Sequence, residues 1–427
     1  MPRKRHEGNR ELGEGLRKTR KSLGLTQIQM AAKMGMDVKT LRRYELGVTS
    51  PTTTWLERWK MEVEIANPRK DSLWQPESEV KFVTALKNAA QSTIKFAGVD
   101  LRTSLLPAHL WDVDNNRKDH LYRDDPEDKR RIYVEWVGSA LPDNLLKRLM
   151  EEIEEQREHL KKGTIALTEE EIANLNEVYR RLTLERSNPY PRLVALPEPI
   201  TMNSTRVLPI FLGRGKYGIS LVVEKNLDLK TASEFRNRYV LHSLPVRVAY
   251  VFDDPPGETW VEFHQRAVEG IATWKGAWDV GAAGYVDPIR HRDPSSPGRI
   301  SLWQTACDEL EKELNLEGYE LPHRDNCHFF GTSQDLPTRH INIIGYCHTH
   351  YRPKENRETG ALVARYDRCR LNPSDVARLI VEKHHWVPCA ILVLILTLEA
   401  NRYSKQEIET AFAKEFSRST NPIDLSA

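Results

Sequence analysis

The nine residues DELEKELNL, at positions 308–316, carry carboxylates at a spacing that could hold a divalent cation. On a helix, Glu309 and Glu313 are four residues apart and therefore share one face. Carboxylate oxygens suit Mg²⁺ and Mn²⁺, and such an ion can activate water for attack on a phosphate. Lys312, three residues after Glu309, adds an ammonium group to the same face. The segment therefore has three interpretations: a catalytic site, a ligand site without catalysis, or a charged surface helix.

The residues before this segment indicate the elements that position it. Ser301 is a good N-cap with Gln304 three residues later, and the helix is expected to end between Asn315 and Gly318. Upstream, VRVAYVFDD (246–254) and TWVEFHQRA (259–267) alternate apolar and polar residues around PPGE, which predicts a β-hairpin. WKGAWDVGAAGYV (274–286) then supplies a further strand and a glycine turn. Two strands, a glycine turn and a capped helix would thus carry the carboxylates.

This order of elements resembles the Nudix family over roughly residues 245–400. The Nudix box is a glycine-led loop followed by a helix that reads Arg-Glu-apolar-x-Glu-Glu-x-Gly-apolar. Here Asp308 stands in place of the arginine, Lys312 in place of one glutamate and Asn315 in place of the glycine. Glu309 and Glu313 match the other two acidic positions, so the resemblance implies that they are the catalytic and metal-binding residues. Mg²⁺ or Mn²⁺ would be the cofactor if hydrolysis is retained, and otherwise no cofactor is expected.

Lys312 decides between the three interpretations. A lysine in place of a glutamate removes one ligand and changes the local charge by two units. One opposing charge at about 4 Å, with an effective dielectric constant of about 20, is worth about 4 kcal/mol against metal binding. The favoured interpretation is a sensor of a nucleoside-diphosphate-type ligand, bound by Lys312 and by Arg266 of the preceding strand. Retained hydrolysis and an ordinary surface helix with an internal ion pair are the alternatives.

Histidine and cysteine residues gather downstream in HRDNCHFF (323–330) and YCHTHY (346–351), but their spacing matches no standard zinc pattern. The five cysteines, none in a CxxC pair, are expected to be free thiols of a cytoplasmic protein. The basic start lacks the apolar core of a secretory signal. The apolar run WVPCAILVLILTL (386–398) is too short to cross a bilayer and predicts a buried helix.

The charge of the chain is unevenly distributed. Residues 1–60 contain 14 Lys and Arg against 6 Asp and Glu, a net charge of +8, whereas the rest carries 49 against 55, a net charge of −6. A basic head on a mildly acidic remainder favours a module that binds a polyanion. Within the head, Gly24 ends one basic helix, Thr26 caps a second, Gly35 makes a tight turn and Asp37 caps a third. Ile28, Ala31, Ala32 and Met34 are expected to form the buried side of the second helix.

Two short helices around a glycine turn are a helix-turn-helix unit, and residues 12–59 resemble the Xre (Cro and lambda-repressor-like) family. The matching string is LR..R...GLTQ..MA..MGMD..TLRRYE.G...P. In that family the third helix enters the major groove, so the resemblance implies double-stranded DNA as a partner. By position, Val38, Lys39, Thr40 and Arg42 would face base edges, and Gln27 and Arg43 would contact DNA near the phosphates. Glu45 is expected to make a salt bridge or hydrogen bond inside the module. The alternative is a protein-binding domain with a solvated basic face.

The middle of the chain shows two amphipathic helical segments, at 140–163 and 168–186, that predict a helical hairpin. The hairpin could form a homodimer or pack internally, and internal packing is favoured because its leucine stripes do not extend over three heptads. GISLVVEK (218–225) predicts a strand. The expected architecture is a multidomain α+β protein: a helix-turn-helix domain at 1–65, a linker and mostly helical region at 66–240, and a Nudix-like α/β/α sandwich at 241–427. The expected function is a transcriptional regulator with a nucleotide sensor; the alternative is an active Nudix hydrolase with an attached DNA-binding domain.

Overall fold

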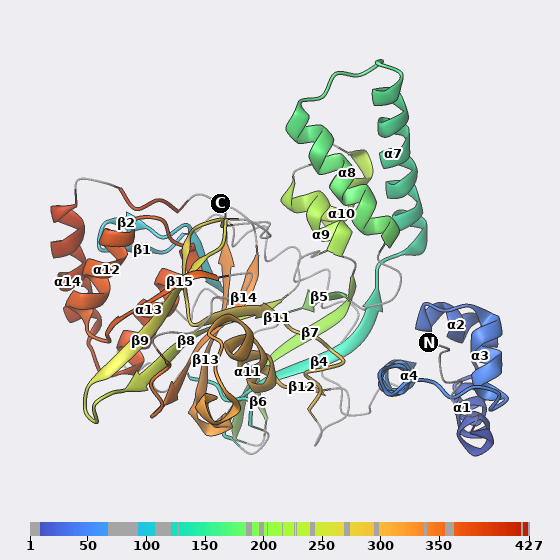
Figure 1. Cartoon of the computed structure of the whole chain (residues 1–427), viewed down its shortest axis with the longest axis horizontal. Coiled ribbons are helices and arrows are strands. Elements are labelled where there is room, and N and C mark those ends of the chain that lie inside the picture. Colours follow the sequence, from blue (N-terminus) through green and yellow to red (C-terminus); the bar gives the residue numbers. More distant parts are fainter. Residues whose placement is uncertain are drawn as a thin grey trace.

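The computed structural model describes residues 9–66, 93–106, 121–125, 128–184, 190–195, 200–202, 204–215, 217–225, 227, 229–239, 244–268, 274–293, 299–336, 340–354, 363–419 and 422–425. Residues 9–66 form an N-terminal head, and we call the described residues from 93 onward the body. The chain is a multidomain α+β protein (Figure 1).

Four helices with their own hydrophobic core build the head. They are α1 (Arg10–Ser22), α2 (Gln27–Met34), α3 (Val38–Glu45) and α4 (Thr53–Ala66). Thr26, the predicted cap of α2, forms a capping box with Gln29, and Gly35, with a φ of 60°, makes the left-handed turn before α3. The buried side of α2 consists of Met30, Ala31 and Met34, so Ala31 and Met34 confirm the expectation. Ile28 and Ala32 instead face solvent, because they lie on the opposite side of this two-turn helix.

The larger of the two main sheets lies at the centre of the C-terminal domain and has eight described strands. Its order is β10-β9-β8-β14-β13-β3, with β11 paired to β8 and β15 paired to β9. β8 and β9 form the predicted hairpin, whereas β8 and β14 are parallel. The strands are β3 (Thr103–Leu106), β8 (Pro245–Asp253), β9 (Thr259–Arg266), β10 (Trp278–Val280), β11 (Ala282–Tyr285), β13 (Cys327–Asp335), β14 (Ile341–Thr349) and β15 (Val363–Arg370).

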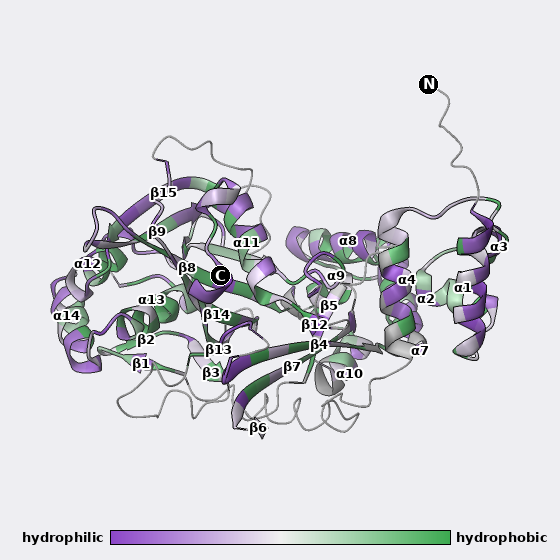
Figure 2. Cartoon of the chain, turned by 90° about the horizontal axis from the view of Figure 1, so that it is seen from below, coloured by the Kyte–Doolittle hydropathy of each residue, from purple (hydrophilic) through white to green (hydrophobic). Residues whose placement is uncertain are grey.

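Helices lie against both faces of this sheet (Figure 1). α11 (Leu302–Glu313) packs on one face together with the smaller sheet. α12 (Pro373–Lys383), α13 (Pro388–Ala400) and α14 (Lys405–Arg418) share a core with the other face. α13 is hydrophobic along most of its length, which confirms the predicted buried helix (Figure 2). Within the described part of the chain, every helix is too short or too polar to cross a membrane.

The middle region differs from the expectation of a mostly helical segment. It contains four strands of the smaller sheet, β4 to β7, and a helical lobe with its own core; the sheet is ordered β12-β4-β7-β5 with β6 on β7, and β12 comes from the C-terminal region. The strands are β4 (Arg130–Ala140), β5 (Tyr190–Ala195), β6 (Ile200–Met202), β7 (Thr205–Gly215) and β12 (Arg299–Ile300). The lobe consists of α7 (Asp143–Lys161), α8 (Glu169–Leu184), α9 (Tyr217–Glu224) and α10 (Lys230–Arg238). α7 and α8 are the predicted hairpin, and they pack internally against α9 and α10.

Two segments differ from their predicted structure. Residues 218–225, predicted as a strand, lie in α9, because their apolar side chains complete the core of the helical lobe. A short apolar run suits a buried strand and a buried helix equally well, so tertiary packing decides between them. Residues 103–106, which the predicted boundaries placed in the linker and mostly helical region, form β3 and pair with β13 of the C-terminal sheet. Short pieces β1 (Lys95–Phe96) and β2 (Val99–Asp100) precede β3.

Candidate ligand site and DNA interface

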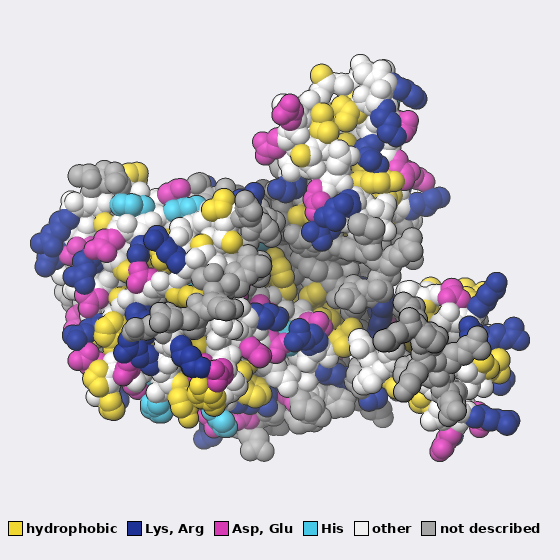
Figure 3. All heavy atoms as spheres, viewed as in Figure 1, with side chains coloured by type: hydrophobic (Ala, Val, Ile, Leu, Met, Phe, Trp, Pro, Cys, Tyr) yellow, Lys and Arg dark blue, Asp and Glu magenta, His cyan; other side chains and the backbone are white. Residues whose placement is uncertain are grey.

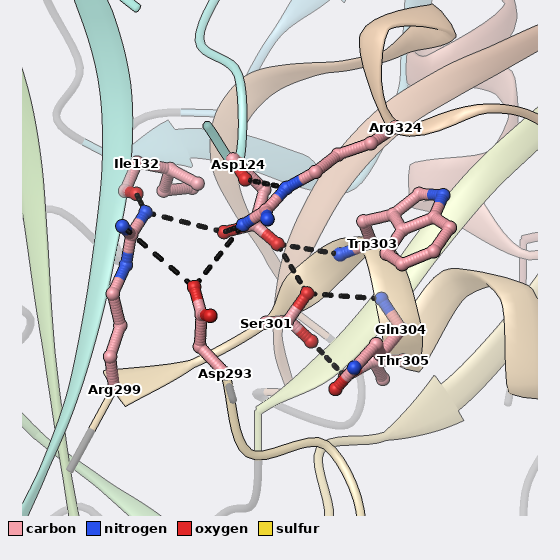
Figure 4. Close-up of polar contacts among 9 residues, drawn as sticks. All are labelled: Asp124, Ile132, Asp293, Arg299, Ser301, Trp303, Gln304, Thr305 and Arg324. Carbon is pink, nitrogen blue, oxygen red and sulfur yellow. Dashed lines mark hydrogen bonds and ion pairs between the residues drawn. The ribbon is translucent and has the colours of Figure 1, made fainter. Parts of the chain in front are cut away.

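The start of α11 is fixed by a buried carboxylate from the segment before β4 (Figure 4). The Ser301 hydroxyl caps the helix and donates a hydrogen bond of 2.6 Å to Asp124 Oδ2. The Trp303 backbone N–H donates to the same oxygen at 3.0 Å. A negative charge at a helix N-terminus is favoured by the exposed N–H groups and by the helix dipole. Asp124 therefore holds the helix that carries the candidate site.

The buried Arg299 and Asp293, together with the partly exposed Arg324, complete this network (Figure 4). Arg299 Nη2 donates to Asp124 Oδ1 at 3.4 Å and to the Ile132 carbonyl, in β4, at 3.3 Å. Arg324 Nη2 lies 3.2 Å from Asp293 Oδ2 and 3.7 Å from Asp124 Oδ1. Paired in this way, the buried charges are compensated. The network ties the first turn of α11 to the smaller sheet.

Glu309 points from α11 towards β11 and makes an ion pair on the helix surface. Lys312 Nζ lies 2.5 Å from Glu309 Oε1, with side-chain exposures of 46% for the lysine and 12% for the glutamate. A Cβ atom added at Gly284 would lie 2.0 Å from the Glu309 carboxyl carbon, so a larger residue there would displace the Glu309 side chain. The predicted glycine-containing strand and the predicted helix thus meet at Glu309. The Glu309 carboxylate is paired to Lys312, the residue that stands in place of a glutamate in the Nudix-like sequence.

Glu313, one turn further, is buried between the helix and the sheet. Its Oε2 accepts a hydrogen bond of 2.7 Å from the Ala283 N–H, and burial raises the pKa of Glu313 to about 8. His264 Nε2 lies 3.9 Å from the same oxygen, while His264 Nδ1 is 3.0 Å from the Gly281 carbonyl. Because burial lowers the pKa of His264 to about 4, the histidine is neutral near pH 7 and this contact is not an ion pair.

Arg266, predicted as a ligand-binding residue, lies beside this pair but is already engaged. Its Nη1 is 3.2 Å from Asp279 Oδ2, while Arg247 Nη1 is 2.9 Å from Asp279 Oδ1. Side-chain exposures are 16% for Arg266, 6% for Arg247 and 0% for Asp279. Both guanidinium groups contact the Asp279 carboxylate, and Arg247 also interacts electrostatically with Asp335. Arg266 is the more exposed of the two arginines, and its guanidinium group is suited to an anion.

The side chains at this position do not fit a divalent cation as they stand. Among the described residues, no group of three or more His, Cys, Asp or Glu side chains is arranged to hold a metal ion. One Glu309 oxygen is bonded to Lys312, and one Glu313 oxygen accepts a backbone hydrogen bond. Mg²⁺ requires several oxygen ligands in near-octahedral geometry, and two engaged carboxylates do not offer them.

The other two departures from the Nudix box are each accommodated by the structure. Asp308 is bonded to Arg290 Nη2 at 2.8 Å and to His291 Nε2 at 3.0 Å, so an acid is suited to this place. Asn315 follows the end of α11 with a φ of 50°. Asparagine tolerates this left-handed conformation better than most residues, which allows it to replace glycine there.

Several residues of the site were missed by the sequence reasoning. His264, Asp279 and Arg247 lie on strands for which the sequence predicted only a hairpin or a glycine turn. Each is a polar residue within a mostly apolar strand, which is the sequence pattern that could have indicated a site. His348 Nε2 and His350 Nδ1 lie 3.1 and 3.5 Å from Asp253 Oδ2. Asp253 ends β8, His348 lies near the end of β14, and His350 directly follows that strand.

In the head, Glu45 makes the internal contacts that the sequence predicted. Its carboxylate is buried, and it accepts hydrogen bonds from Arg20 Nε at 2.5 Å and Arg20 Nη2 at 3.0 Å. Gln27 Nε2 donates a further one at 2.8 Å. Although burial opposes ionisation, the hydrogen bonds from Arg20 and Gln27 lower the pKa of Glu45. This network joins α1, α2 and α3 into one unit.

Residues 16–58, which span most of α1 to α4, match the family model described as helix-turn-helix. The head is a helix-turn-helix domain. No curated protein matched the sequence. The solved structures similar to the chain include the NUDIX domain of NrtR from Shewanella oneidensis, complexed with ADP ribose, with 15% identity, a TM-score of 0.28, and coverage of 40% of this chain and 97% of that one. They also include a C. elegans Ap4A hydrolase binary complex, with 13% identity, a TM-score of 0.22, and coverage of 41% and 96%.

The helix-turn-helix domain presents only part of the predicted DNA-contacting set to solvent. Lys39, Arg42 and Arg43 of α3 are exposed. Lys and Arg side chains also stand along the edge of the domain that faces away from the body (Figure 3). Thr40 donates to the capping residue Asp37 at 2.5 Å, and Val38 packs against the domain core. Gln27, as described above, bonds to Glu45.

Proposed function

We propose that this protein is a sequence-specific DNA-binding transcriptional regulator whose Nudix-like C-terminal domain senses a nucleoside-diphosphate-type ligand. The helix-turn-helix match and the exposed basic residues of α3 support the DNA-binding part. Lys39 and Arg42 are the residues we propose for base edges, with Arg43 near the phosphates. Val38, Thr40 and Gln27 remain in the proposed contact set. Each already contacts another residue of the domain, so less of its side chain is available to DNA.

The Lys312–Glu309 ion pair is the observation that carries the sensor assignment. It consumes a carboxylate that a hydrolytic metal would need and leaves a half-exposed ammonium group on the same helix face. Arg266, whose side chain is 16% exposed, adds a guanidinium group close to Glu313 of the same helix. A diphosphate satisfies such a site without any metal, because guanidinium and ammonium groups pair directly with phosphate oxygens. Binding without cleavage is what this charge distribution supports.

One observation favours the second candidate, an active Nudix hydrolase with an attached DNA-binding domain. Glu309 and Glu313 lie on one face of α11 and both reach the glycine-bearing strand β11. If Lys312 moved away, these carboxylates would form part of a metal site, with Mg²⁺ or Mn²⁺ as the cofactor. The two candidates therefore differ in where the Lys312 ammonium group lies when ligand is present.

Titration calorimetry and a hydrolysis assay with ADP-ribose, NAD and ADP, each with and without Mg²⁺ or Mn²⁺, separate them. We expect ADP-ribose to bind without turnover, and Lys312→Glu to weaken binding at least about tenfold, since about 1.4 kcal/mol of phosphate contact is lost. Glu311→Gln, which alters an exposed charge on the same helix, is the matched control and should bind as the wild type does. Turnover by the wild type that disappears in Glu309→Gln would establish the hydrolase instead. Failure of every nucleotide to bind would reject both candidates.

A further inference from the structure

An arginine of the body reaches into the helix-turn-helix domain. Arg214 lies near the end of β7, and its guanidinium group forms an ion pair with Glu62 of α4. Its Nη1 also donates a hydrogen bond of 2.9 Å to the Lys33 carbonyl in the last turn of α2. The Glu62 side chain is 2% exposed and the Arg214 side chain 24% exposed. One guanidinium group thus holds two helices of the domain at once.

The chemistry of this contact indicates a specific docked interface. Glu62 is a buried acid, and a buried charge is tolerated only when it is paired. A cation at the C-terminus of α2 also meets carbonyl groups that lack partners inside the helix. The Lys33 side chain is half-buried at the same place. Burial lowers the pKa of Lys33, and the positive charge of Arg214 lowers it further. Separation of the two modules would leave Glu62 without this cation.

The docked orientation leaves the DNA-reading helix free. In both views, α4 lies on the side towards the body, whereas α1 and α3 lie on the far side (Figures 1 and 2). Lys39, Arg42 and Arg43 are exposed in this arrangement. The docking contact therefore sets the direction in which the body presents α3.

A short chain of backbone contacts connects Arg214 to the candidate ligand helix. β12 ends at Ile300, directly before the cap Ser301 of α11, and pairs with β4 at Ile300 and Val134. β4 in turn pairs with β7, where Ala140 is the partner of Arg214. Asp124 adds a second connection, because it bonds to the first turn of α11 and to Arg299 of β12. The ligand helix and the head contact thus share one sheet.

We propose that Arg214 docks the helix-turn-helix domain on the body through Glu62 and the end of α2, and that this contact transmits ligand binding at α11 to DNA binding. The docking part stands on the contact alone, whereas the coupling part rests on the proposed function. Coupling requires that ligand and DNA each change the affinity for the other by the same factor.

Hydrogen exchange of the full chain, without ligand or DNA, tests the docking. Arg214→Ala and Glu62→Gln should each speed exchange in α4 and at the end of α2, because those amides lose the protection of the interface. Arg206→Ala, on the same strand but away from the head, is the control for damage to the sheet and should leave head exchange unchanged. The docking would be overturned if the single variants exchanged as the wild type does. It would also be overturned if the two increases in exchange rate simply added in the double variant.

Fluorescence anisotropy tests the coupling, with an operator selected from random DNA by the wild-type protein and ADP-ribose as the probe ligand. We expect ADP-ribose to change wild-type DNA affinity by at least about fivefold and Arg214→Ala affinity by less than about twofold. Calorimetry of both proteins should give equal ADP-ribose affinities. A ligand effect that persists in Arg214→Ala overturns the coupling through this residue. If the wild type does not bind ADP-ribose, the proposed function fails and the coupling is rejected with it. The hydrogen-exchange result then still decides whether the docking is correct.

Discussion

Replacement of Glu313 by glutamine should remove a pH dependence of folding stability. Burial raises the pKa of Glu313 from an ordinary value of 4.5 to about 8, so the folded chain keeps a proton that the unfolded chain has lost between these two values. Stability therefore falls as pH rises through this window and levels off above about pH 8. His264, with a pKa lowered to about 4 from 6.5, acts with the opposite sign but only below about pH 6.5. Between pH 6.5 and 8 the wild type should lose about 2 kcal/mol that Glu313→Gln does not lose.

Urea unfolding followed by tryptophan fluorescence, at steps from pH 6.5 to 8.5 with EDTA present, measures this difference. The glutamine side chain keeps an oxygen for the Ala283 N–H, so the hydrogen bond of 2.7 Å is preserved and only the ionisation is lost. Subtraction of the two stability curves also cancels the titration of the cysteines. A difference between wild type and variant that stays constant with pH would refute the reasoning. In that case Glu313 would be ionised in the folded protein and available to a cation, which would favour hydrolysis.

Three further outcomes are expected. Arg42→Ala should weaken specific operator binding by about 1–3 kcal/mol with the fold intact by circular dichroism, and unchanged binding would contradict the groove assignment. Glu45→Ala should destabilise the head by about 3–5 kcal/mol in thermal unfolding because Arg20 is left buried without its partner, whereas Glu14→Ala, whose pair is exposed, should cost less than about 1 kcal/mol. Asp124→Ala should lower the urea midpoint of the C-terminal domain, since the first turn of α11 loses its carboxylate, and an unchanged midpoint would deny that role.

Features encoded by nearby residues could be predicted from the sequence. Ser301 with Gln304 gave the start of α11, and the β8–β9 hairpin followed from alternation around a short turn. Thr26, Gly35 and Asp37 likewise marked the ends of α2 and α3, because capping and turn conformations depend on a few adjacent residues.

Features that depend on distant contacts could not be predicted. β7 is a long buried strand, yet Pro209 within it argues against a central strand. The proline is tolerated because β6 pairs with residues 205–207 and β5 with residues 211–215, which leaves a gap at position 209. Asp124 and Trp303 are 179 residues apart in the chain, and no local pattern reports their hydrogen bond.

Each residue of α11 that differs from the Nudix box, which this segment resembles in sequence, has a physical role in the structure. Asp308 pairs with Arg290 and His291, Asn315 takes the left-handed turn, and Lys312 pairs with Glu309. Gly284 still leaves the space that the Glu309 side chain occupies. A helix that carries the Lys312 ammonium group and packs closely on the sheet is suited to hold an anion in a fixed place. Its attachment to the sheet that docks the head is what a sensor requires and a free-standing hydrolase does not.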